Sequence, residues 1–153
     1  MSKIFEDYFS EIQADMVTIC LEYVDNRAEK VYIYCSFESN TISSDYFYKI
    51  NEMILERHKL NEISINTSER YDTSIERQKG VIKILNSDIN NMLKLCGQYK
   101  REMPTEIKLV YDVSKNSLKA KYRYDLVYSN DPVKTADDIA MEWFEEIRSE
   151  YSK

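Results

Sequence analysis

Glycine, proline and histidine are scarce in this chain, which has two glycines, two prolines and one histidine among 153 residues. So few glycines exclude a glycine-rich phosphate-binding loop. A single histidine leaves no histidine pair for a zinc site. No apolar run is long enough to cross a bilayer, and the first ten residues lack the apolar segment of a secretory signal. We therefore expect a cytoplasmic protein without a membrane partner.

Cysteine and basic residues are also limited. Cys20, Cys35 and Cys96 form no CxxC pair, and each lies at an apolar position of its segment, which predicts core residues. The net charge is −6, with −4 in residues 1–30, −4 in residues 131–153 and +2 between them. Two acidic ends disfavour direct nucleic-acid binding and favour a basic partner.

The first half of the chain changes from a helical to an alternating pattern. Apolar residues recur every three or four positions over residues 2–25, which predicts a helix. Alternation over residues 30–38, 41–50 and 53–58 predicts three strands joined by short turns. Residues 59–72 are polar and predict a loop.

The second half repeats the two patterns. A residue among Asp72, Thr73 and Ser74 is expected to cap a long helix that ends near Arg101, before Pro104. Residues 105–113 and 118–128 alternate and predict a hairpin, and Thr135 is expected to cap a last helix. These elements predict one α+β domain over residues 1–153: an antiparallel sheet of about five strands, with an N-terminal, a long central and a C-terminal helix. We expect all the helices to cover one face of the sheet.

Catalytic chemistry has little support in the sequence. His58 is the only histidine, its neighbours on a strand would point to opposite faces, and no GxSxG motif is present. A surface position for His58 is therefore the more natural interpretation. We expect no enzymatic activity, no cofactor and no metal, although three carboxylates in the last helix could in principle approach a metal.

Two features point instead to binding. The last helix is rich in carboxylates, which suit either a solvated face or a basic protein surface. The 13 tyrosines suit half-buried sheets and protein contacts. Tyr32 and Tyr34 are expected on a sheet face shared with Phe47 and a basic strand, a pattern that also occurs in RNA-binding sheets, and they would serve a protein contact or pack under a helix. The candidate contact residues are Asp137, Asp138, Glu142, Glu145, Glu146, Tyr32 and Tyr34, with Trp143 as a further anchor.

The order of elements resembles the YezG-like immunity (antitoxin) family of polymorphic toxin systems. The resemblance rests on an N-terminal helix leading into residues 29–34 (EKVYIY), a strand meander, and a long helix that ends in a proline. It continues with residues 104–107 (PTEI), which open a hairpin finishing in residues 122–126 (YRYDL). Thr105 stands where the family pattern has tryptophan.

This resemblance implies a protein that binds and neutralises a cognate secreted toxin. The toxin would be a basic nuclease whose active surface is masked by tight stoichiometric binding in the cytosol. A non-catalytic interaction adaptor or secretion chaperone remains the alternative, because such proteins are also small, acidic and α+β. The oligomeric state stays open, since unpaired edge strands could join two copies.

Overall fold

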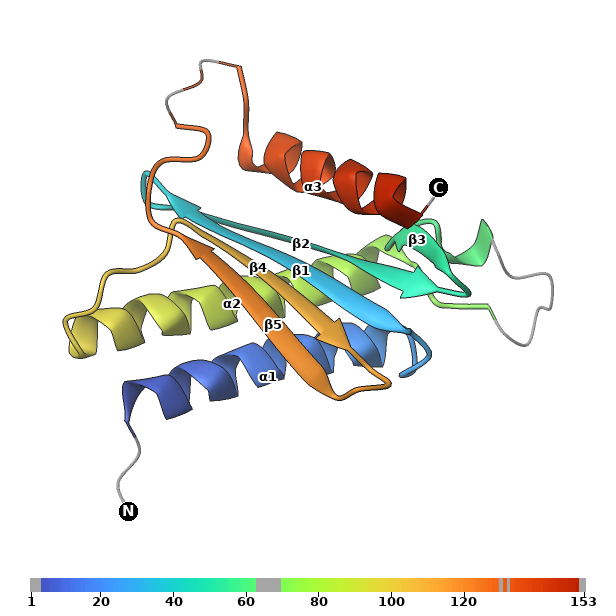
Figure 1. The fold of residues 1–153 in the computed structure, drawn as a ribbon, viewed down its shortest axis with the longest axis horizontal. Coiled ribbons are helices and arrows are strands. Elements are labelled where there is room, and N and C mark those ends of the chain that lie inside the picture. The colour runs from blue at the N-terminus through green and yellow to red at the C-terminus, as the bar shows by residue number, and fades with distance from the viewer. Residues whose placement is uncertain (1–3, 63–69, 130, 132, 152–153) are drawn as a thin grey trace.

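The computed structural model describes residues 4–62, 70–129, 131 and 133–151. Three α-helices and five strands follow one another in the predicted order (Figure 1). Their bounds are α1 Phe5–Tyr23, β1 Lys30–Glu38, β2 Thr41–Ile50, β3 Met53–Glu56, a 3-10 turn η1 Leu60–Glu62, α2 Ile75–Gln98, β4 Glu106–Asp112, β5 Ser117–Arg123 and α3 Ala136–Tyr151. The α+β class and the five-stranded antiparallel sheet are thus confirmed.

The sheet has the strand order β3-β2-β1-β4-β5, and every neighbouring pair is antiparallel. β1 therefore lies at the centre, and the long helix α2 joins the meander to the β4–β5 hairpin on the far side of β1. The turns at Ser39–Asn40 and Asn51–Glu52 each have two residues with positive φ, as tight two-residue hairpins require.

Strand β5 ends at Arg123, five residues before the predicted end of that strand. Continuing the register would place Asp125 opposite Pro104, which has no N–H to donate. The chain is instead fixed by Thr105, whose hydroxyl donates to the carbonyl of Asp125 at 2.5 Å. Residues 124–128 leave the sheet and lead across it toward α3.

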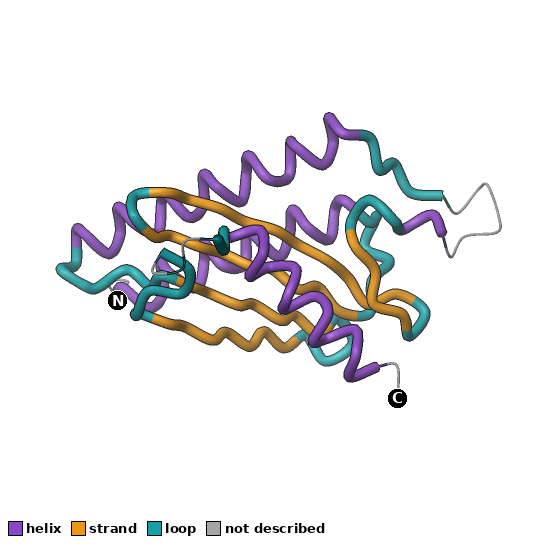
Figure 2. The backbone as a smooth tube through the Cα atoms, turned by 90° about the horizontal axis from the view of Figure 1, so that it is seen from above, coloured by secondary structure: helices purple, strands orange, loops and turns teal. Residues whose placement is uncertain are grey.

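The helices lie on both faces of the sheet, so the expectation that all would cover one face is wrong. α1 and α2 pack together beneath the sheet, and α3 crosses above the strands on the opposite face (Figures 1 and 2). The reason lies in β1 and β2, which carry large apolar side chains on both faces. Val31 and Ile33 face α1 and α2, whereas Tyr32 and Phe47 belong to a separate cluster under α3.

The larger core lies between the sheet and the α1–α2 layer. Ser74 caps helix α2, because its hydroxyl accepts a hydrogen bond from the backbone N–H of Arg77. The helix buries a stripe that includes Leu85, Ile89 and Met92. Cys20, Cys35 and Cys96 are buried and unbridged in this core, as predicted. Burial raises the pKa of all three thiols, so they act as apolar side chains.

One carboxyl group is buried at the α1–α2 contact. Asp88 is 8% exposed, and its Oδ2 has no hydrogen-bond partner among the residues described. Burial first, and then the neighbouring carboxyl of Asp15, raise the pKa of Asp88 to about 7. The folded protein therefore holds this proton more tightly than the unfolded chain, whose Asp has a pKa of about 3.9.

We expect the Asp88→Asn variant to be more stable than the wild type at pH 8, by on the order of 2 kcal/mol. Because the folded-state pKa is raised, ionised Asp88 lowers stability as pH rises from about 4 to about 7, and its cost is constant above that. Urea unfolding at pH 8 and pH 3 measures the difference, which should nearly vanish at the lower pH because both states are then protonated. Equal differences at both values would contradict the assignment.

Candidate protein-binding surface on α3

Helix α3 begins with a reciprocal cap. The Thr135 hydroxyl accepts a hydrogen bond from the backbone N–H of Asp138 at 3.3 Å, and the Asp138 carboxylate accepts one from the backbone N–H of Thr135 at 2.9 Å. Thr135 is thus the predicted cap. Asp137 and Asp138 lie in the first turn, where the helix dipole favours negative charge.

An aromatic cluster holds α3 on the sheet. Trp143 is 5% exposed, and its ring lies edge-on to Phe47 at 5.1 Å and to Tyr32 at 5.8 Å between ring centroids. Phe144 meets Phe47 at 5.1 Å, and Tyr32 stacks on Phe47 at 4.7 Å. The ammonium group of Lys108 lies 5.5 Å from the Trp143 ring centroid. These contacts fix the orientation of α3 and therefore of its outer face.

Tyr32 and Tyr34 do not belong to an exposed contact surface. They are 2% and 1% exposed, because α3 covers the part of the sheet face where they lie. The prediction that these two tyrosines contact a partner is wrong for this arrangement, and the alternative, packing under a helix, is what the structure shows. The prediction for Trp143 is wrong for the same reason, because its side chain is buried between α3 and the sheet and cannot contact a partner.

The predicted carboxylates lie on the outside of α3. The helix buries Ala136, Ala140, Trp143 and Phe144 against the sheet. Its exposed carboxylates are those of Asp137, Asp138, Glu142, Glu145, Glu146 and Glu150. Arg148 is the only basic residue within α3, so this outer face, which we call the α3 acidic face, is strongly negative.

Two of these carboxylates form ion pairs with neighbouring basic side chains. Lys134 contacts the Glu142 carboxylate at 3.0 Å, and Arg148 contacts that of Glu145 three residues earlier in the helix. Both pairs are exposed, and such pairs add little to stability. Within the described part of the chain, Asp137 and Glu146 have no ion-pair partner. The α3 acidic face can therefore exchange water and weak local pairs for the cations of another molecule.

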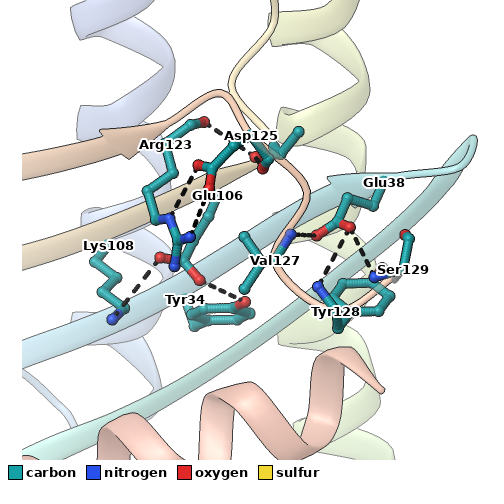
Figure 3. Close-up of polar contacts among 10 residues, drawn as sticks. Tyr34, Glu38, Glu106, Lys108, Arg123, Asp125, Val127, Tyr128 and Ser129 are labelled. Carbon is teal, nitrogen blue, oxygen red and sulfur yellow. Dashed lines mark hydrogen bonds and ion pairs between the residues drawn. The ribbon is translucent and has the colours of Figure 1, made fainter. Parts of the chain in front are cut away.

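The segment that leads from β5 to α3 is fixed by one carboxylate on β1. Glu38 is 2% exposed and accepts hydrogen bonds from the backbone N–H groups of Val127, Tyr128 and Ser129 at 3.0, 3.4 and 3.1 Å (Figure 3). Burial alone would raise the pKa of Glu38, but hydrogen bonds from Ser129, Val127 and Tyr128 outweigh burial and lower it.

We expect Glu38→Gln to destabilise the protein at pH 7 by roughly 1–3 kcal/mol, because a neutral amide accepts these N–H bonds less strongly than a carboxylate. The pKa of Glu38 is lowered by folding, so its contribution is present above the unfolded-state pKa and is lost as pH falls through the folded-state pKa. Thermal unfolding of the variant and of an exposed control, Glu102→Gln, measures the effect. A Glu38→Gln loss that persists unchanged at pH 3 would contradict a charge-based role.

A second buried polar group lies beside this segment. The Tyr34 hydroxyl donates to the carboxylate of Glu106 at 3.0 Å, and Lys108 lies 3.8 Å from the same carboxylate (Figure 3). Burial, followed by the charge of Glu106, raises the pKa of Tyr34. Tyr34 therefore stays a neutral donor that ties β1 to β4 beneath α3.

The single histidine of the sequence lies at the rim of a small cavity on the α3 side of the sheet. His58 is exposed, as predicted, and its Nε2 lies 3.5 Å from Glu56. It borders a cavity of about 200 Å³ between β2, β3 and α3, where Asp45 forms an ion pair with Arg57. No serine, threonine or cysteine lines this cavity. Across the described ranges, no three His, Cys, Asp or Glu side chains converge as a metal site would require.

The sequence predicts the acidic residues of α3 but not the contacts that orient the helix. Glu38 gave no signal, because a carboxylate at a strand end before a turn is common on protein surfaces. The burial of Trp143 was readable from its spacing with Ile139 and Ile147. What the sequence lacked was an indication of which face of the sheet would receive that apolar stripe.

No helix within the described residues has the length and apolarity that a membrane span requires. No protein-family model matches the chain, and no curated protein sequence matches it significantly.

Proposed function

We propose that this protein is an immunity protein that neutralises a cognate secreted toxin in the cytoplasm by stoichiometric binding. One observation carries the proposal: α3 is locked to the sheet by the Trp143 cluster and turns six exposed carboxylates outward. A fixed array of like charges costs little to reorganise when a partner of opposite charge binds.

The chemistry of the partner follows from this charge. A nuclease has a basic active surface because it binds phosphate, so an acidic helix gains both electrostatic steering and complementarity there. Masking such a surface requires no catalytic residue. The surface area that α3 alone could bury against a partner is small for a stable protein interface. The exposed Met141 and the β2–β3 side of the helix would extend the contact.

The test is co-purification with the toxin domain that is encoded immediately upstream, followed by an assay of toxin activity. We expect an equimolar complex in which the activity is abolished. Absence of both binding and inhibition with the neighbouring toxin domain would overturn the proposal.

A second candidate, a secretion chaperone or interaction adaptor, is favoured by a different observation. A cavity of about 380 Å³ lies between α1, the end of α2 and the end of β5. Phe5, Phe9, Tyr122 and Tyr124 line it, and the two tyrosines are exposed. A chaperone would place an apolar side chain of an unfolded client there, whereas an immunity protein binds a folded domain. If the protein bound the toxin domain encoded upstream only when that domain is unfolded, the result would favour the chaperone candidate.

A further inference from the structure

Strand β5 is an open edge of the sheet. It is seven residues long, lies at one end of the strand order, and is paired only with β4 among the residues that the structure describes. The opposite edge strand, β3, has only four residues. An unpaired edge of this length presents a row of backbone donors and acceptors to another chain.

The register shows which backbone groups point outward. Phe37 donates its N–H to the carbonyl of Thr105 at 2.9 Å, and Val113 donates to Glu29 at 3.0 Å. The backbone N–H and C=O groups of odd-numbered β4 residues therefore form hydrogen bonds with β1, and those of even-numbered β4 residues form them with β5. Lys119 and Lys121 lie opposite those even-numbered residues, so their backbone groups are already bonded.

The outward backbone groups of β5 belong to the alternate residues, Leu118, Ala120 and Tyr122. Their side chains lie on the α1 side of the sheet, where the Gln13 amide donates to the Tyr122 hydroxyl at 2.7 Å. The side chains of Lys119 and Lys121 lie on the opposite face, the face that also carries α3. A strand added here would thus meet apolar groups on one face and cations on the other.

Lys119 and Lys121 are the two lysine side chains of this edge strand. Both are exposed, and neither has an ion-pair partner within residues 4–62, 70–129 and 133–151. Two neighbouring cations are paired, since Arg123 contacts Asp125 at 2.8 Å and Lys108 contacts Glu106 at 3.8 Å. These two positive charges stand out in a chain whose net charge is −6. They suit acidic side chains opposite them.

A second copy of this chain is a poor occupant. Symmetric antiparallel pairing about Ala120 would set Lys119 of each copy opposite Lys121 of the other, and like charges directly opposite are destabilising. Lysines on an edge strand commonly serve to prevent such self-pairing. The same lysines attract a strand of opposite charge.

We propose that β5 accepts an extended protein strand whose side chains alternate between acidic residues, next to Lys119 and Lys121, and apolar residues, next to Leu118 and Tyr122. This surface has the opposite charge to the α3 acidic face, so the proposal does not depend on the toxin-binding proposal and is tested without a toxin.

The test uses a nine-residue peptide of alternating glutamate and valine and measures amide hydrogen exchange of the whole protein by NMR. In the free protein the amides of Leu118, Ala120 and Tyr122 should exchange quickly, and those of Lys119 and Lys121 slowly. Saturating peptide should slow exchange at the three outward amides at least tenfold. A lysine–valine peptide of the same length should leave them unchanged.

Two variants separate strand addition from general attraction. Ala120→Pro removes an outward N–H without breaking a bond to β4, a position that edge strands tolerate, and should abolish binding while the remaining amides keep their protection. Lys119→Glu with Lys121→Glu should weaken binding at least tenfold. The matched control, Lys83→Glu with Lys94→Glu on α2, should bind as the wild type does.

Three results would overturn the proposal. One is unchanged exchange at the outward amides with saturating acidic peptide. Another is equal binding of the acidic and basic peptides. The third is slow exchange at these amides in the free protein together with a dimer in sedimentation, because a second copy would then occupy β5.

Discussion

Reversing the charge of Glu142, Glu145 and Glu146 together to lysine is expected to weaken binding of the proposed partner, a basic toxin domain, roughly 100-fold. The three side chains lie on consecutive turns of the α3 acidic face and are all exposed. Their reversal turns attraction into repulsion over the whole central part of that face. Titration calorimetry with the toxin domain measures the change in affinity.

The control for this variant makes the same change in net charge at a different place on the protein. Replacing Glu22, Glu76 and Glu102 with lysine alters the charge of the whole protein by the same amount, but these residues lie in or next to the α1–α2 layer on the other side of the sheet. We expect this control to retain most of the wild-type affinity. Equal losses in both variants would mean that net charge, and not the α3 acidic face, determines binding.

Replacing Trp143 with alanine is expected to lower the free energy of unfolding by about 3–5 kcal/mol. The indole fills the space between α3 and the sheet, where it contacts Tyr32 and Phe47. The small cluster beneath α3 cannot close over a void of that size, so α3 would lose its fixed orientation. Urea unfolding followed by circular dichroism measures the loss.

The matched control is Met141→Ala on the same helix. Met141 is 44% exposed, and removing its side chain should change stability by no more than about 0.5 kcal/mol. If the Trp143→Ala variant lost less than about 1 kcal/mol, the docking of α3 would not depend on the aromatic cluster. Trp143 is the only tryptophan, so its fluorescence in the wild type also reports whether α3 is docked.

The strand order along the chain could be predicted because local signals agree with the fold. Alternation in β1 and β2 and the two-residue turns between the first three strands set the meander, and Pro104 marks the start of the hairpin. Ser74 and Thr135 carry the hydroxyls that cap the two later helices. These features depend on residues close in sequence.

The placement of α3 could not be predicted for a different reason. A strand with large apolar side chains on both faces, such as β1, indicates that both faces are covered but does not say by what. Tyr32 therefore appeared equally suited to a protein contact and to packing under a helix. Only the contact with Trp143, more than 100 residues later, decides between the two.

The end of β5 shows a similar limit. Alternation continues through residues 124–128, so the pattern alone predicts a longer strand. The pairing of β5 ends at Arg123 because the next hydrogen bond would need a backbone N–H from Pro104, which has none. Three backbone hydrogen bonds to the Glu38 carboxylate then hold residues 127–129 away from the sheet ladder. Both causes are contacts between segments distant in sequence.

The most direct measurement is carboxylate footprinting of the complex with the toxin domain, in which a carbodiimide and an amine label exposed Asp and Glu side chains. We expect toxin binding to protect Asp138, Glu142, Glu145 and Glu146 from labelling. Glu22, Glu76 and Glu102 should label as they do in the free protein. Protection of the second group with full labelling of the first would contradict the assignment of the binding surface to α3.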